Sequence, residues 1–230
     1  MFVPLHDDTP LRVIRFQFVT LAIIVGNVII FLMTGAFQSD QMLAGIATSF
    51  GVVPSDLTHA ASQNIPFSPI PEPLTFLTYM FLHAGWLHLI SNMLFLWVFA
   101  DNVEDAFGYF AFTLFYVLCG IAGALAHVIM TPDSPAPLIG ASGAVSGVIG
   151  AYALLYPKAR VWILLFFRIP LRISAIWVLG GWFLLQVFSV LTAETGDDVQ
   201  VAWWAHIGGF IAGLAITFVL RSRLLVRPAS

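Results

Sequence analysis

The sequence predicts an all-α membrane protein, a single bundle of six transmembrane helices. Of the 230 residues, 60% are hydrophobic and only 9% are charged, whereas soluble domains are about 25% charged. Several apolar runs approach the length of about 20 residues that a helix needs to cross a hydrocarbon core of about 30 Å. The six expected spans are residues 16–37, 86–103, 110–130, 142–156, 173–191 and 201–220.

The chain is expected to form one membrane domain, residues 1–230, with a helical core at about 13–220, because no repeat or low-complexity linker divides it. The N-terminus lacks the basic-then-apolar pattern of a cleaved signal, so we expect the first apolar run to be retained. The longest connection, residues 38–85, has a Phe-rich second half. We expect it to pack on the bundle or rest in the interface, with a short helix at 73–82. The single cysteine, Cys119, excludes a disulfide framework.

Basic residues define the orientation. With the N-terminus inside, every Lys and Arg falls in a cytoplasmic tail or loop, and the outer loops carry acids only. Positive residues favour the cytoplasmic side, so both termini are predicted there. We expect the prokaryotic plasma membrane, because no organellar targeting stretch precedes the first span. The nine basic residues are Arg12, Arg15, Lys158, Arg160, Arg168, Arg172, Arg221, Arg223 and Arg227.

Four polar residues of three different spans are predicted to lie at one depth. A helix rises about 1.5 Å per residue, which places all four about 18–24 Å above the cytoplasmic boundary. They are Ser142, His206, His88 and Asn92. Polar side chains inside a bilayer are costly and mark functional sites. The loop before Ser142 must then dip into the protein, which is tolerated only where it lines a cavity.

Ser142 opens an apolar helix, where unpaired N–H groups and the helix dipole favour negative charge. Gly140 and Gly143 let other backbone approach it. Gly143, Gly147 and Gly150 mark one helix, and Ala205, Gly209 and Gly213 recur every four residues on the last. Such small-residue faces allow close packing in membranes. Contact between them brings the Ser142 hydroxyl to the His206 imidazole, as a nucleophile and its base require.

His88 and Asn92 are four residues apart and therefore share one helix face. Both side chains can donate hydrogen bonds to a tetrahedral oxyanion, together with a backbone N–H near Gly140 and Ser142. Each of these residues has a simpler reading as well: a serine at a helix start is usually a cap, and a buried histidine usually ties helices together. The combination favours catalysis.

In four motifs the chain resembles the rhomboid family of intramembrane serine proteases. The matching residues are His83-x4-His88-x3-Asn92, Val103-Glu104 with Gly108, Gly140-Ala141-Ser142-Gly143, and Ala205-His206-x2-Gly209-x3-Gly213. The resemblance implies a rhomboid-like six-helix bundle in which Ser142 is the nucleophile and His206 the base. It also implies oxyanion contacts from His88 and Asn92, a lateral substrate gate near Trp182, and a cap formed by the following loop. One departure is Ser146, where several bacterial members have an aromatic residue stacked on the histidine.

The sequence therefore predicts a serine endopeptidase that cleaves transmembrane substrates in the outer half of the bilayer through a Ser142–His206 dyad. His83 and Glu104 are expected to be structural, and Gly209 and Gly213 to serve packing. No cofactor, metal or nucleic acid is expected; the partners are transmembrane protein substrates and the lipid bilayer. The alternatives are a catalytically silent relative that binds client helices and a transporter, although no inverted repeat favours the transporter.

Overall fold

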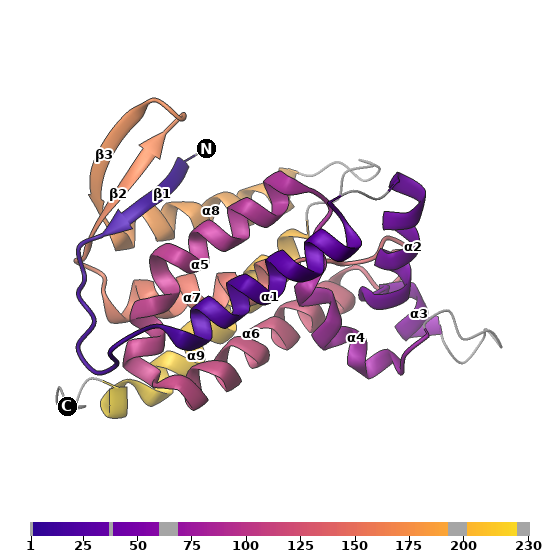
Figure 1. Ribbon diagram of the computed structural model, residues 1–230, viewed down its shortest axis with the longest axis horizontal. Helices are drawn as coiled ribbons and strands as arrows, with labels where there is room; N and C mark the ends of the chain where they lie inside the picture. The colour runs from indigo at the N-terminus through magenta and orange to yellow at the C-terminus, as the bar shows by residue number, and fades with distance from the viewer. Residues whose placement is uncertain (1, 37–38, 60–68, 193–201, 225–230) are drawn as a thin grey trace.

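The computed structural model describes residues 2–36, 39–59, 69–192 and 202–224. Its long helices lie side by side along the long axis of the molecule (Figure 1). Each predicted span overlaps one of them, and the predicted all-α membrane bundle is confirmed. They are α1 (Phe18–Thr34), α5 (Trp86–Phe107), α6 (Tyr109–Met130), α7 (Ser142–Leu155), α8 (Ala175–Thr192) and α9 (Trp203–Leu224).

The six helices differ in whether each is long and apolar enough to cross a membrane. Among the described residues, α6, α8 and α9 are long and apolar enough to cross alone. A fourth span is formed if α5 is joined to the short helices before it, from which it is bent by 84°. The helices α1 and α7 are apolar but have only 17 and 14 residues.

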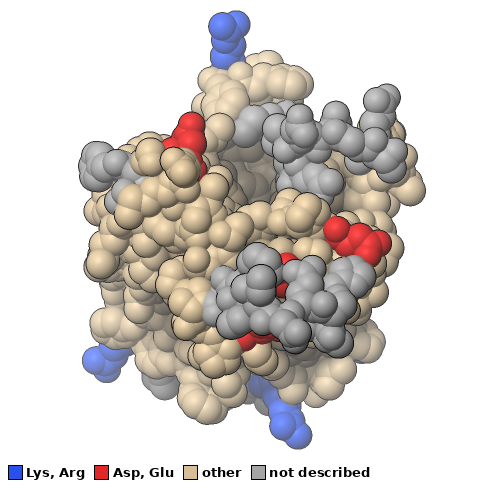
Figure 2. Space-filling view, turned by 90° about the vertical axis from the view of Figure 1, so that its right-hand side faces the viewer, with Lys and Arg blue, Asp and Glu red and all other residues tan. Residues whose placement is uncertain are grey.

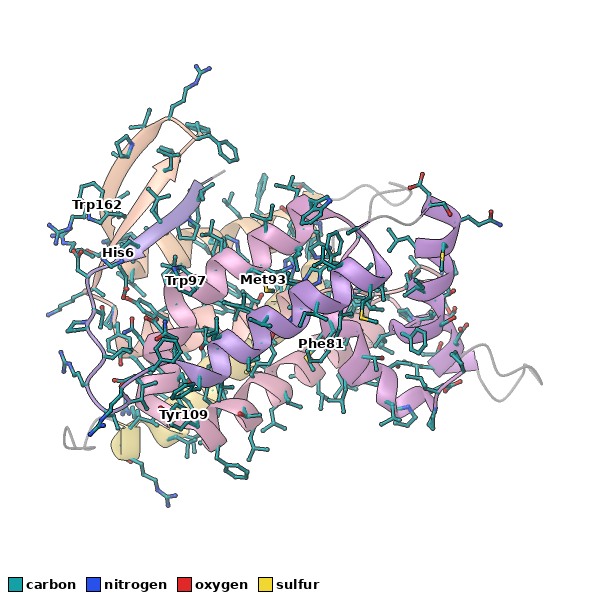
Figure 3. The ribbon with its side chains drawn as sticks, in the orientation of Figure 1. His6, Phe81, Met93, Trp97, Tyr109 and Trp162 are labelled. Carbon is teal, nitrogen blue, oxygen red and sulfur yellow. The ribbon has the colours of Figure 1, made fainter. Side chains whose placement is uncertain are left out.

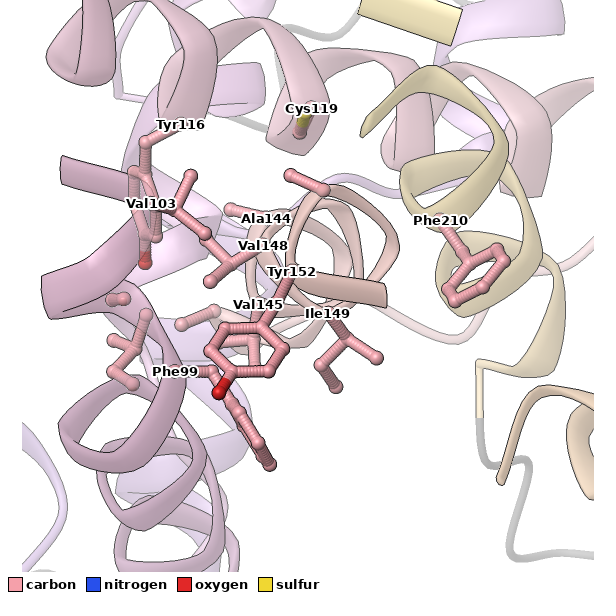
Figure 4. Close-up of a cluster of buried hydrophobic side chains, with 14 of the residues drawn as sticks. Phe99, Val103, Tyr116, Cys119, Ala144, Val145, Val148, Ile149, Tyr152 and Phe210 are labelled. Atoms are coloured by element: carbon pink, nitrogen blue, oxygen red, sulfur yellow. The ribbon is translucent and has the colours of Figure 1, made fainter. Parts of the chain in front are cut away.

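Helix α7 is the centre of the bundle. All residues from Gly143 to Ala153 are buried, as expected for a helix that is apolar on every side. It packs most extensively on α9, and also on α6 and α5. Figure 4 shows α7 surrounded by apolar side chains of its neighbours, among them Phe99, Tyr116 and Phe210.

The connection between α1 and α5 is folded onto the bundle. It holds α2 (Asp40–Phe50), α3 (Pro54–His59), α4 (Glu72–Thr78) and the 3₁₀ helix η2 (Tyr79–Phe81), so the predicted short helix at 73–82 is confirmed. Thr78 Oγ1 donates a hydrogen bond of 2.6 Å to the carbonyl of Phe50. Figure 2 views this end of the molecule: acidic side chains lie on the face, whereas Lys and Arg appear only at the rim.

Two buried carboxylates hold the N-terminal segment at the other end. Glu104 is fully buried and accepts hydrogen bonds of 2.9 and 2.7 Å from the N–H groups of Val19 and Thr20, which open α1. Asp105 accepts from three further N–H groups, including those of Val13 and Ile14 at 2.7 Å. Carboxylates satisfy the unpaired donors at a helix start and complement its dipole.

A small antiparallel sheet was not expected from the sequence. It joins β1 (Phe2–Asp7), β2 (Arg160–Leu165) and β3 (Ile169–Ser174) in that order. Phe2 pairs with Leu165, so the N-terminal tail lies beside the loop between α7 and α8. This pairing agrees with the predicted placement of both segments on one side of the membrane. Figure 3 shows His6 and Trp162 on the sheet, which stands to one side of the helices.

The turn between β2 and β3 has an unusual composition. Phe166 and Phe167 have φ values of 50° and 58°, and the N–H of Arg168 bonds the carbonyl of Leu165 at 3.1 Å. A hairpin β-turn with positive φ at both central positions normally contains Asn-Gly there. In this left-handed region, a residue with a β-carbon is destabilised by about 1–2 kcal/mol. Both rings are exposed, so burial does not offset that cost.

Replacing the pair by Asn-Gly should therefore stabilise the protein. We expect Phe166→Asn/Phe167→Gly to raise the free energy of unfolding by about 1–2 kcal/mol, measured by thermal unfolding in a mild detergent. The double alanine variant removes the same rings without relieving the backbone and serves as the control. Equal stability of the two variants would show that the turn is not strained.

Candidate active site

Ser142 is the first residue of α7. A helix of 14 residues is about 21 Å long, about 9 Å shorter than the hydrocarbon core. If α7 ends near the cytoplasmic boundary, Ser142 lies inside the membrane, below the outer surface. The loop before it is pinned from both sides: Leu138 pairs with Val52 across an isolated bridge, and the Gly140 N–H donates a 2.9 Å hydrogen bond to the Tyr79 carbonyl.

The glycine seam, defined as Gly143 and Gly147 of α7 against Gly209 and Gly213 of α9, brings the two helices into backbone contact. A β-carbon on Gly209 would overlap the carbonyl of Gly143, and one on Gly213 would overlap that of Gly147. The predicted contact between these small-residue faces is confirmed. Close approach of this kind is how membrane helices gain packing energy where no hydrophobic force drives them together.

The seam places the residues next to Ser142 and His206 against one another. A β-carbon on Gly143 would lie 3.6 Å from the carbonyl oxygen of Ala205. Gly143 follows Ser142 directly, and Ala205 precedes His206. The two candidate catalytic residues therefore stand on neighbouring turns of two helices that touch.

His88 approaches the serine from a third helix, at the start of α5. A β-carbon built on Gly140 would lie 2.6 Å from Nε2 of His88 and 3.8 Å from Oγ of Ser142. Gly140 also has φ of 120°, which side chains with a β-carbon rarely adopt. Its N–H donates to the carbonyl of Tyr79, and the role of Gly140 as an oxyanion donor stays a prediction. The missing side chain at Gly140 leaves room for the imidazole.

His206 is held by a side chain of α8, a contact that the sequence alone does not indicate. Its Nδ1 lies 2.8 Å from Oε1 of Gln186, a side chain that is 6% exposed. The rings of Trp182 and Trp203 both lie 6.0 Å from the imidazole, centroid to centroid. A lone polar residue within an apolar span is the signal that could have revealed Gln186.

Ser146 occupies the position where several family members have an aromatic residue. Its hydroxyl donates a 2.6 Å hydrogen bond to the carbonyl of Ser142, one turn earlier. The side chain is buried and satisfies its own helix. The aromatic contacts to His206 come instead from Trp182 on α8 and Trp203 at the start of α9.

The remaining polar candidates cluster around His88. Asn92 is buried and donates from Nδ2 to the carbonyl of His88 at 3.0 Å. An amide group carries two N–H donors, so one is left. His83 is buried, and its ring centroid lies 5.0 Å from that of His88. Neither contact assigns a chemical role by itself.

The candidate gate lies on α8. Trp182 stands between α5 and α9, with its ring centroid 6.3 Å from that of Phe95 and 6.0 Å from that of His206. The loop that was expected to cap the site falls on residues 193–201, outside the described residues. Within the part of the chain that the structure describes, no three His, Cys, Asp or Glu side chains converge as a metal site would require.

Comparison with known proteins identifies relatives of one kind. A family model described as "Rhomboid domain" matches residues 71–223. "RHOMBOID-like protein 5" of Arabidopsis thaliana is 30% identical over 149 residues, which is 65% of this chain and 43% of that protein. "RHOMBOID-like protein 6, mitochondrial" of the same plant is 28% identical over 159 residues, 69% of this chain and 46% of that protein.

A bacterial relative is similar over a shorter stretch. "Rhomboid protease GluP" of Bacillus subtilis (strain 168) is 44% identical over 80 residues, which is 35% of this chain and 15% of that protein. The chain spans less than half the length of each of these three relatives. One of them is named as a mitochondrial protein and another comes from a bacterium, so the comparisons select no compartment.

The seam can be tested by adding a single methyl group. Gly209→Ala should lower the free energy of unfolding by about 1–3 kcal/mol, because the obstructing atoms are backbone and cannot rotate away. Gly180→Ala on α8 is the matched control, since a β-carbon there meets nothing within 4 Å. We expect the control to be at least as stable as the wild type. Equal thermal unfolding of the two variants in detergent would contradict the seam.

Proposed function

Because the chain belongs to the rhomboid family, we propose that it is an intramembrane serine endopeptidase with Ser142 as nucleophile and His206 as general base. The observation that supports this proposal is the backbone contact of α7 with α9 at Gly143 and Gly209, which sets Ser142 and His206 on adjoining helices. A hydroxyl and an imidazole on touching helices can come within the hydrogen-bond reach that a serine nucleophile needs from its base.

The proposed reaction begins when a segment of a substrate's transmembrane helix enters at the outer half of the membrane. The oxygen of Ser142 attacks the peptide carbonyl carbon as the lone pair of neutral His206 accepts the serine proton. His206 then donates this proton to the leaving amine, and an acyl-enzyme remains. Water from the outer face attacks the ester with His206 again as base, which releases the acid and restores Ser142.

The charge that develops on the carbonyl oxygen needs donors that are already in place. The imidazole of His88 lies over Gly140 beside Ser142, and we assign it the main side-chain contact. Asn92 supplies its remaining N–H. The N–H groups at the start of α7 have no intrahelical partner and add the positive end of the helix dipole.

Substrate access is proposed to lie between α5 and α8. Trp182 contacts Phe95 across these two helices and His206 on its inner side, so a displaced Trp182 would open a path from lipid to the imidazole. The partners are then transmembrane proteins within the bilayer. The prokaryotic plasma membrane and the bacterial type of the protein stay predictions from the sequence.

The dyad is tested by cleavage of a transmembrane reporter in proteoliposomes. Ser142→Ala and His206→Ala should each reduce the rate by at least about 10³-fold, because covalent catalysis is lost. Ser146→Ala is the matched control: it removes a buried hydroxyl one turn away, and we expect a rate within about threefold of the wild type.

Two results would count against this proposal. Cleavage retained by purified Ser142→Ala would exclude the serine as nucleophile. A well-folded wild type that neither cleaves the reporter nor reacts with a fluorophosphonate would favour the silent relative that only binds client helices.

A further inference from the structure

A buried glutamine on α8 contacts the imidazole that we assign as the base. Oε1 of Gln186 lies 2.8 Å from Nδ1 of His206. On its other side, Nε2 of the same amide lies 3.3 Å from the carbonyl oxygen of Trp182, one helical turn earlier. Gln186 therefore bridges the backbone of its own helix and a side chain of α9.

These two contacts fix which way the amide is turned. A carbonyl oxygen can only accept, so the amide nitrogen must face Trp182 and the amide oxygen must face His206. The amide oxygen also can only accept, so Nδ1 of the imidazole must carry the hydrogen. A neutral imidazole has one N–H, which leaves the lone pair on Nε2.

We propose that Gln186 is a positioning residue that holds His206 in the tautomer a general base needs, with Nδ1 protonated and Nε2 free to accept the proton of Ser142. The inference rests on the proposed function of His206. In the opposite tautomer, two acceptors would face each other 2.8 Å apart, and Nε2 would carry a hydrogen where the proposed base needs a lone pair. In soluble serine proteases a carboxylate does this orienting; an amide does it here without burying a charge in the bilayer.

The two indole rings that contact His206 cannot make this selection. The rings of Trp182 and Trp203 restrict the plane of the imidazole, but an indole N–H is only a donor and cannot accept from Nδ1. The hydroxyl of Ser146 is committed to the carbonyl of Ser142. Among the described residues that contact His206, Gln186 is the acceptor for Nδ1.

The kinetic test compares two substitutions in the full-length protein in proteoliposomes. Gln186→Leu keeps a similar volume but removes the acceptor. We expect kcat to fall about tenfold with KM nearly unchanged, since one neutral hydrogen bond sets the tautomer ratio. Gln186→Glu retains an acceptor oxygen and should recover most of the rate. Leu185→Ala, an exposed neighbour on α8, is the control and should leave kcat unchanged.

The spectroscopic test does not depend on cleavage. Nitrogen NMR of ¹⁵N-histidine-labelled protein in nanodiscs identifies the ring nitrogen that carries the hydrogen, and the His206 signal is the one lost in His206→Ala. We expect the hydrogen on Nδ1 in wild type and in Gln186→Glu, and a mixture in Gln186→Leu. A wild type with the hydrogen on Nε2, or a leucine variant with unchanged tautomer and rate, overturns the proposal. Should the wild type show no cleavage while the tautomer still follows Gln186, the positioning contact stands and the proposed function fails.

Discussion

The backbone contact between α7 and α9 is the constraint on which the rest of the structure depends. Lipid tails are as apolar as leucine, so helices in a membrane associate by packing and polar contacts rather than by hydrophobic burial. Glycines at four-residue spacing allow the carbonyls of Gly143 and Gly147 to rest on Gly209 and Gly213. Any larger side chain would part the two helices and separate the serine from the imidazole.

The apolar interior of the bilayer also explains how the polar atoms of the site are arranged. A polar group without a hydrogen-bond partner inside a bilayer costs free energy. Several polar groups around Ser142 are hydrogen-bonded to their neighbours. The Gly140 N–H is bonded to Tyr79, the Ser146 hydroxyl to the Ser142 carbonyl, and the His206 ring to Gln186. These three hydrogen bonds hold the loop and the imidazole in place, which the proposed reaction at Ser142 requires.

Much of this arrangement could be predicted from the sequence because membrane helices have simple rules. Length and apolarity located the six spans, and the spacing of small residues located the α7–α9 contact. The sheet was missed because β1 and β2 are six-residue strands far apart in the chain, and their pairing is a tertiary contact that no local pattern encodes. Gln186 was missed because a single amide in an apolar run says nothing of its partner until α8 and α9 are placed side by side.

The most direct test of the account is an experimental structure of the fluorophosphonate-treated protein in lipid nanodiscs. We expect the phosphonyl group on Oγ of Ser142, its oxygen directed at His88 and the first N–H groups of α7, and Nε2 of His206 within hydrogen-bond distance of the serine oxygen. An adduct on another residue, or a His206 ring separated from Ser142 by packed aliphatic side chains, would contradict it.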